Sequence, residues 1–201
     1  KYLGKTFDIH GGGLDLLFPH HENEIAQSCS NNSTDILANY WVHNGFLTMN
    51  KEKMSKSLGN IDTISEVLSN YNGQVIRLAL LSAHYKQPLD WSEKLLEQSK
   101  ATLEKWYELY DEVENKNDNS EIFSYLLDDL NTPKYFAKLH ELYNVASKRD
   151  KTKRNEFNEA CRLIGIFNQK KDILVKEKRD ASNIDKKYIL QKIEERIKAR
   201  K

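Results

Sequence analysis

The sequence predicts an α/β segment at the start of the chain, followed by an all-α segment. The first observation is a short strand-like run, residues 6–9, that leads into three glycines and then a helical pattern. The second is a series of apolar positions that recur at helical spacing from Leu95 to Val113. The third is the composition: 39% of the 201 residues are hydrophobic and 30% are charged, which suits amphipathic helices packed around a core.

Three successive glycines, Gly11, Gly12 and Gly13, follow the predicted strand, and Asp15 lies two residues beyond them. Glycine removes the side chain where a backbone must approach a flat or phosphorylated ligand. An acidic side chain beside such a turn can accept hydrogen bonds from ribose hydroxyls. The pattern therefore predicts a nucleotide-binding edge, and a flexible turn after the strand is the alternative.

A helix is expected to begin at Pro19, with His20 and Glu24 four residues apart on one face. Imidazole and carboxylate are both zinc ligands, so this pair could form half of a metal site. A protein zinc site needs three or four ligands, and Cys29 lies too far round the helix to be a third. The alternative is an ordinary His–Glu pair on a helix surface.

A basic segment, Lys53-Met54-Ser55-Lys56-Ser57, holds two lysines and two serines and is followed by a Gly-Asn turn signal. Lysine is a point charge on a flexible stem, and it can follow a phosphate group as that group moves. The serines add short hydroxyl donors. The segment predicts a mobile phosphate-handling loop, and a solvated basic turn is the alternative.

Capping and stop signals divide the remaining sequence into helices. Thr63 and Glu66 form a capping box that opens a short helix, and Ser92 caps a long helix expected to run to about Val113. A charged segment, residues 170–187, is expected to be a linker. Further helices are expected at about residues 74–84, 121–130, 133–148 (capped by Thr132), 153–164 (ended by Gly165) and in a last segment with Ile189, Ile193 and Ile197 on one face.

The net charge of +1 conceals an uneven distribution. Residues 104–130 hold nine acidic and two basic side chains, whereas residues 148–201 hold eighteen basic and nine acidic ones. A basic half favours an anionic partner, nucleic acid first, although lysine-rich helix surfaces are also ordinary. No apolar run approaches the roughly 20 residues that span a bilayer, and the two cysteines form no disulfide framework. We therefore expect a cytoplasmic protein with no membrane contact.

These segments, taken together, resemble one family. The run from Phe7 to Gln27, FDIHGGGLDLLFPHHENEIAQ, closely resembles a block of the cysteinyl-tRNA synthetases, and Lys53–Ser57 spells the KMSKS loop of class I aminoacyl-tRNA synthetases. The similarity continues through residues 40–45, 81–85 and 88–91, and it reaches residues 128–133. It implies the C-terminal part of a Rossmann-like class I catalytic domain followed by an α-helical bundle.

The resemblance also implies a domain organisation. Residues 1–50 would complete the nucleotide-binding domain, residues 51–92 would hold the KMSKS loop and a stem-contact region, and residues 93–201 would form a bundle that binds tRNA on the anticodon side. The chain begins at Lys1 and lacks the HIGH-type motif of the class, so we expect a fragment that is inactive alone. We expect the intact enzyme to be a monomer.

Residue by residue, the resemblance implies the following roles. Lys56 would contact ATP, supplied with Mg²⁺, and Lys53 would assist it; these two are the candidate catalytic residues. The glycine triplet and Asp15 would bind the adenosine. His20 and Glu24 would be two of four Zn²⁺ ligands, the other two being cysteines that this chain lacks, and His10 would lie in the substrate pocket.

The implied reaction activates L-cysteine with ATP and transfers it to tRNA(Cys). One alternative is the cysteine ligase of mycothiol synthesis, which shares the catalytic architecture but uses an amino sugar as acceptor. A second alternative, from a different functional class, is a nucleic-acid-binding helical module without activity.

Overall fold

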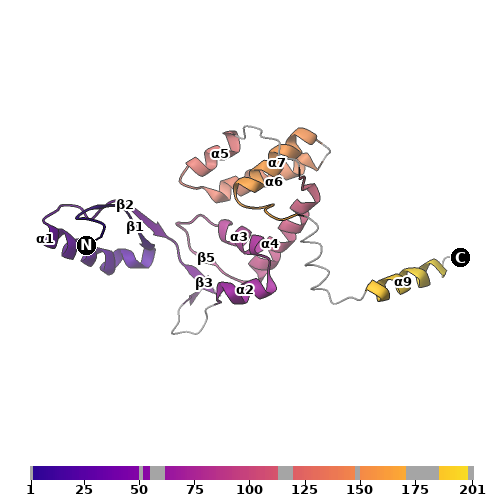
Figure 1. Ribbon diagram of the computed structural model, residues 1–201, viewed down its shortest axis with the longest axis horizontal. Coiled ribbons are helices and arrows are strands. Elements are labelled where there is room, and N and C mark those ends of the chain that lie inside the picture. Colours follow the sequence, from indigo (N-terminus) through magenta and orange to yellow (C-terminus); the bar gives the residue numbers. More distant parts are fainter. Residues whose placement is uncertain are drawn as a thin grey trace.

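The computed structural model describes residues 2–49, 52–54, 62–112, 120–147, 150–170 and 186–198. In these residues an N-terminal α/β unit, a small second sheet and a helical bundle follow one another along the longest axis (Figure 1). A separate helix, α9 (Lys186–Lys198), lies beyond the bundle. The predicted order, α/β followed by α, is confirmed.

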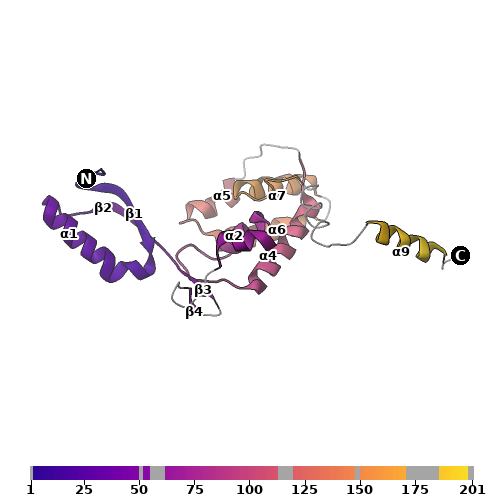
Figure 2. The ribbon, with the colours of Figure 1, turned by 60° about the horizontal axis from the view of Figure 1, so that its bottom comes forward.

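The N-terminal unit is a parallel pair of strands with a helical crossover. Strand β1 (Phe7–Gly13) pairs with β2 (Ala38–Asn44), with His10 opposite Trp41 and Gly12 opposite His43. Two short helical turns, η1 (Leu14–Leu16) and η2 (Leu17–His21), lead into helix α1 (Glu22–Asn32), which carries the chain back to β2. Figure 2 shows α1 alongside the two strands.

Two predictions for this unit were wrong in detail. The glycine triplet forms the last three residues of β1 instead of a turn after it, because β2 offers backbone partners as far as Gly13. Helix α1 begins at Glu22, and Pro19–His21 belong to the turn η2, which follows the extended Phe18 and leads directly into α1, so the predicted start was three residues early. His20 therefore precedes α1, although it remains one helical turn from Glu24.

The second sheet has three short strands in the order β4, β3, β5. Strand β3 (Leu47–Met49) pairs antiparallel with β4 (Glu52–Lys53) and parallel with β5 (Leu89–Asp90). Between β4 and β5 lie helices α2 (Ile64–Asn70) and α3 (Gly73–Leu81). The described part of residues 45–91 therefore forms a second unit, in which the chain leaves the first sheet after β2 and comes back through β5 to pair with β3.

The bundle contains α4 (Glu93–Trp106) with the short turn η4 (Tyr107–Leu109), α5 (Ser120–Leu127), α6 (Thr132–Ala146) and α7 (Lys151–Leu163). Helix α3 packs on α4, and α6 packs on α5 and α7. One hydrophobic core joins these helices to the β3–β5 unit. Its largest fully buried side chains include Trp106, Tyr135, Phe157, Leu103, Leu139 and Ile166.

A short segment after α7, residues 164–170, crosses the bundle, and we call it the strap. Gly165 has φ +75°, which confirms the predicted stop. Gln74 of α3 accepts a hydrogen bond from the backbone N–H of Phe167 (2.8 Å), and the Tyr107 hydroxyl lies 3.0 Å from the same oxygen. The strap therefore belongs to the core and joins α3 to η4.

Several helix ends differ from those predicted. Helix α3 ends at Leu81, and α4 ends at Trp106 instead of near Val113, with η4 after it. Tyr107 and Tyr110 continue the apolar stripe because their rings pack against Phe167 of the strap. The N-cap of α6 is Asn131, not Thr132, because the Thr132 hydroxyl donates to the carbonyl of Ala83.

Helix α9 carries exposed apolar side chains, Ile193 and Ile197 among them, as the predicted stripe requires. The side chain of Ile189 and the predicted linker beyond residue 170 lie outside the described residues. Of the helices in the described ranges, none has the length and apolar character to cross a membrane. The predicted domain boundaries after residues 50 and 92 stay predictions.

The capping box of α2 permits a stability test. Thr63 accepts from the backbone N–H of Glu66, and the Glu66 carboxylate accepts from the backbone N–H of Thr63 at 2.9 Å. We expect Thr63→Ala to lower the free energy of unfolding by about 1 kcal/mol, because the backbone N–H of Glu66 loses the hydroxyl that accepts its hydrogen bond. Urea denaturation measures this, and Ser65→Ala, in the same exposed first turn, should change little.

Candidate active site

The candidate site lies on one face of the β1–β2 pair. In an extended strand, successive side chains point to opposite faces, and the alternation is visible in β2: Trp41 and His43 are partly buried, whereas Tyr40 is exposed. His10 of β1 lies opposite Trp41, and their ring centroids are 4.6 Å apart. The two strands thus bring an imidazole from β1 and two aromatic rings from β2 to the same place.

Helix α1 adds a carboxylate to these rings. Glu24 has one oxygen, Oε2, at 3.0 Å from His10 Nε2 and the other, Oε1, at 3.5 Å from His20 Nε2. Ligand atoms of His10, His21 and Glu24 all lie within 4.8 Å of one another. A single carboxylate therefore lies between imidazoles from the strand and from the turn that precedes α1.

His21 is the most enclosed member of this cluster, with 2% of its surface exposed. Its Nδ1 lies 2.9 Å from His43 Nε2 at the end of β2, so one of the two nitrogens donates and the other accepts. Burial lowers the pKa of His21, and the neighbouring imidazoles of His10 and His43 lower it further. The lowered pKa favours the neutral imidazole, and Nε2 has a free lone pair in the tautomer in which Nδ1 donates to His43.

Two of the three glycines make room for side chains of this chain. A Cβ at Gly12 would lie 2.8 Å from Cε1 of His21, closer than atoms pack. A Cβ at Gly13 would collide with the carboxylate of Asp15. At Gly11 the nearest atom, a backbone oxygen of Val42, is at an ordinary 3.5 Å. The triplet therefore lets the imidazole cluster and Asp15 pack directly on the strand.

The donor set suits a divalent metal of the zinc type. Imidazole nitrogen and carboxylate oxygen are both zinc ligands. Glu24 Oε2 is buried and makes no hydrogen bond of acceptable geometry, although His10 lies near it, so its lone pairs are available to a cation. The predicted pair, His20 and Glu24, lies within reach of one ion, although His20 is largely exposed.

The KMSKS segment is described only at its start. The backbone of Lys53 belongs to β4 and pairs with Thr48 of β3, and the Met54 side chain packs against the hydrophobic core. Ser55–Ile61, and with them Lys56, lie outside the described residues. The β3–β4 pair lies at the start of the segment, and the next described element after it is α2 with its capping box.

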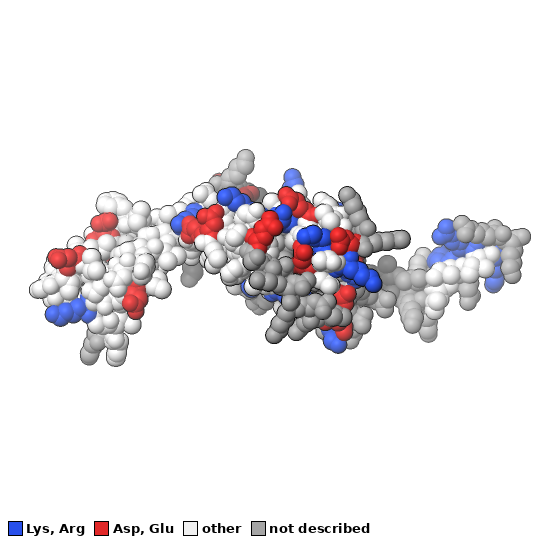
Figure 3. Space-filling model, turned by 90° about the horizontal axis from the view of Figure 1, so that it is seen from above, with Lys and Arg blue, Asp and Glu red and all other residues white. Residues whose placement is uncertain are grey.

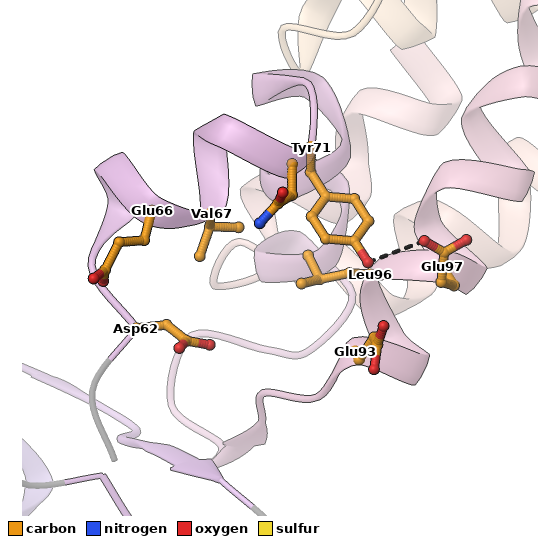
Figure 4. A pocket seen from close by; sticks show the side chains of 8 residues that line it. Asp62, Glu66, Val67, Tyr71, Glu93, Leu96 and Glu97 are labelled. Atoms are coloured by element: carbon orange, nitrogen blue, oxygen red, sulfur yellow. Dashed lines mark hydrogen bonds between the residues drawn. The ribbon is translucent and has the colours of Figure 1, made fainter. Parts of the chain in front are cut away.

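A separate hollow of about 540 Å³ lies where α2 faces the start of α4 (Figure 4). Four carboxylates line it, from Asp62, Glu66, Glu93 and Glu97. The Tyr71 hydroxyl donates to Glu97 at 2.9 Å, and burial, with this carboxylate, raises the pKa of Tyr71 to about 12. An acidic lining disfavours phosphate, so this hollow is not the nucleotide site.

Three of the residues that form the cluster were not predicted from the sequence: His21, Trp41 and His43. A signal for two of them was present, because the alternation of Tyr40, Trp41, Val42 and His43 is that of a strand with one covered face. No local pattern could identify His21, since its place depends on the missing side chain of Gly12.

The chain is similar over its whole length to curated cysteine–tRNA ligases. It is 54% identical to the one of Pelagibacter ubique over 201 residues and 47% identical to the one of Afipia carboxidovorans over 199 residues. These matches cover 100% and 99% of this chain, but 44% and 43% of the relatives. The chain thus spans less than half the length of the relatives it matches.

Two solved structures show the same fold at low sequence identity. A leucyl-tRNA synthetase from Agrobacterium radiobacter, solved in a ternary complex with tRNA and LeuAMS, is 15% identical, with a TM-score of 0.57 over 80% of this chain and 26% of its own. A Mycobacterium tuberculosis methionyl-tRNA synthetase, solved with methionyl-adenylate, is 14% identical, with a TM-score of 0.50 over 80% of this chain and 40% of its own.

A family model, described as the catalytic domain of class I (C) tRNA synthetases, matches residues 1–101. The matched range contains the imidazole–carboxylate cluster, the glycine triplet, the KMSKS segment and both sheets. The fold, the spacing of these features and the match agree: the chain belongs to the class I (C) tRNA synthetase family.

Proposed function

We propose that the intact protein, meaning this chain together with any sequence its gene encodes before and after it, is a cysteine–tRNA ligase. The observation that carries the proposal is 54% identity over all 201 residues to a relative of that name. The aligned residues include the cluster and the KMSKS segment, where the chemistry would be done. We place the protein in the cytoplasm, where translation takes place.

The reaction has two steps that need positioning and charge neutralisation but no side-chain nucleophile. In the first, an oxygen of the cysteine carboxylate attacks the α-phosphorus of ATP and pyrophosphate leaves. Lys56, assisted by Lys53, neutralises the charge that develops on the pyrophosphate. The backbone of Gly11–Gly13 and the carboxylate of Asp15 hold the adenosine. In the second step, a hydroxyl of the terminal ribose of tRNA takes the cysteinyl group and AMP leaves.

We assign His20 and Glu24 as protein ligands of a Zn²⁺ ion, with the remaining ligands from outside this chain. A bound zinc would accept the thiolate of cysteine, and this selects cysteine over serine because sulfur is the better zinc ligand. His10, whose Nε2 lies 3.0 Å from Glu24 Oε2, would line the substrate pocket beside the ion. His21, fixed by His43, would pack behind it.

Pyrophosphate exchange in the intact protein tests this proposal. Radiolabelled pyrophosphate should enter ATP only when cysteine is present, and serine should not replace cysteine. Adding a tRNA(Cys) transcript or the amino-sugar acceptor of mycothiol synthesis separates the two ligase activities. If no amino acid supports pyrophosphate exchange, the protein is not a ligase, and the alternative of a nucleic-acid-binding module would stand.

The basic C-terminal part is the segment we assign to tRNA contact. Figure 3 shows acidic and basic side chains interspersed over the bundle, with basic side chains on α9. A cut near Gly165 would remove Ile166 and Phe167 from the core, so the test truncation must follow Lys170. Residues 171–201 hold eleven basic and six acidic side chains.

We expect that removing residues 171–201 weakens tRNA binding and makes it less sensitive to salt, because fewer phosphate contacts release fewer counterions. Filter binding over a series of salt concentrations measures the slope. Cysteine-dependent pyrophosphate exchange is the internal control and should survive the truncation. An unchanged salt slope would show that these lysines and arginines do not contact tRNA.

A further inference from the structure

The turn between α5 and α6 has an unusual backbone. Asp129 and Leu130 are consecutive, neither is glycine, and both have positive φ angles of +53° and +52°. Side chains with a Cβ rarely adopt this left-handed conformation, and two in succession persist only where surrounding contacts hold them. Contacts of Asp129 with the rest of the protein are therefore expected to hold this turn.

The Asp129 carboxylate is held by the turn that follows α3. Its Oδ1 accepts from the Tyr85 hydroxyl at 2.7 Å, and its Oδ2 accepts from Lys86 Nζ at 2.5 Å. His84 Nε2 lies 3.9 Å from Oδ2. The Lys86 ammonium and the Tyr85 hydroxyl lower the pKa of Asp129, so the carboxylate is ionised and both hydrogen bonds are charge-assisted.

A second contact joins the same two turns. The Thr132 hydroxyl, at the start of α6, donates to the carbonyl of Ala83 at 3.1 Å. Residues 83–86 are therefore attached to the α5–α6 turn at two points. Because α5 and α6 belong to the bundle, these contacts tie residues 83–86 to it.

Tyr85 extends this connection to the sheet that carries the candidate site. Its carbonyl accepts from the backbone N–H of Gly45 at 2.7 Å, and Gly45 follows the last residue of β2. A Cβ at Gly45 would collide with the backbone of Gln87, so the two segments are packed tightly. One residue thus links β2, which bears His43, to Asp129 in the bundle.

We propose that Asp129 is a positioning residue: through Tyr85 and Lys86 it fixes the helical bundle against the catalytic sheet, so that bound tRNA presents its terminal ribose to the adenylate. This inference rests on the proposed function. It predicts a role in the second step of the reaction and none in the first, since ATP and cysteine bind on the catalytic side alone.

The test uses the intact protein and compares the two steps. Asp129→Asn keeps the shape and tolerates positive φ, but it removes the charge held by Lys86. Tyr85→Phe removes only the hydroxyl and keeps the backbone bond to Gly45. The matched control is Asp128→Asn in the same turn, because Asp128 pairs at 3.5 Å with Lys134 of the adjacent helix, within the bundle.

We expect Asp129→Asn and Tyr85→Phe each to lower kcat/KM for tRNA(Cys) aminoacylation on the order of fivefold, the low end of coupling between two sites. Cysteine-dependent pyrophosphate exchange should not change, and Asp128→Asn should resemble the wild type in both assays. The double variant should lose less than the product of the two single effects, because both changes act on contacts of the same side chain.

Two results would overturn the inference: aminoacylation unchanged in both variants, or exchange and aminoacylation reduced in equal proportion, which indicates loss of folded enzyme. Tyr85→Phe serves as the variant of smallest structural change if thermal melting shows that Asp129→Asn unfolds. Failure of the proposed function would look different, because the wild type itself would then show no cysteine-dependent exchange.

Discussion

Replacing Lys56 by alanine in the intact protein should slow formation of cysteinyl-adenylate by about 10²–10³-fold, the usual effect of removing one well-placed electrostatic contact from a transition state. The reason is the charge that develops on pyrophosphate as it leaves, which Lys56 would neutralise. Single-turnover formation of the adenylate measures the rate, and equilibrium binding of cysteine should be nearly unchanged.

The matched control is Lys51→Ala, which removes the same charge two residues before the five-residue motif. That variant should activate cysteine at close to the wild-type rate. If Lys56→Ala instead kept the full activation rate and lost only affinity for tRNA, the segment would be a nucleic-acid contact and not part of the activation machinery.

Replacing His20 by alanine should remove zinc and cysteine activation together, while ATP binding persists. Zinc content, measured by atomic emission, should fall from about one per chain to near zero, because a tetrahedral site that loses one of its few ligands binds far more weakly. The isolated 201-residue chain should likewise hold no stoichiometric zinc after dialysis, since the two cysteine ligands that the resemblance implies lie outside it.

The structure also contains an alternative set of zinc ligands. His10, His21 and Glu24 also converge, so His21→Gln is the control variant. If the His20→Ala variant keeps its zinc and the His21→Gln variant loses it, the ion is bound by His10, His21 and Glu24, and the assignment of His20 is wrong. A His20→Ala enzyme that still selects cysteine over serine would contradict it as well.

Elements with strong local chemistry could be predicted from the sequence. The capping box of Thr63 and Glu66, the Ser92 cap and the Gly165 stop are all present, because each depends on residues within one helical turn. Family membership was equally accessible, since Lys53–Ser57 and the block before it are specific in their order and spacing.

Features that depend on distant partners could not be predicted. Helix α4 ends early where Tyr107 packs against Phe167. The N-cap of α6 is not Thr132, because the Thr132 hydroxyl donates to the carbonyl of Ala83. The same holds for the site: His21 meets His43 across 22 residues and needs a glycine on a neighbouring strand. Periodicity and propensity report on neighbours in sequence, and they do not encode such contacts.

The strap has a consequence for synthesis on the ribosome. The side-chain oxygen of Gln74 finds its backbone donor at Phe167, 93 residues later, and the side-chain amide of Asn72 donates to the side-chain oxygen of Gln169. Until the strap has emerged, these polar groups lack the partners that the strap supplies, and an apolar core closed by Ile166 and Phe167 remains open. The helices that follow the KMSKS segment therefore reach their final packing only after translation has passed residue 169, so a prematurely terminated chain would be a substrate for proteolysis instead of a partly working enzyme.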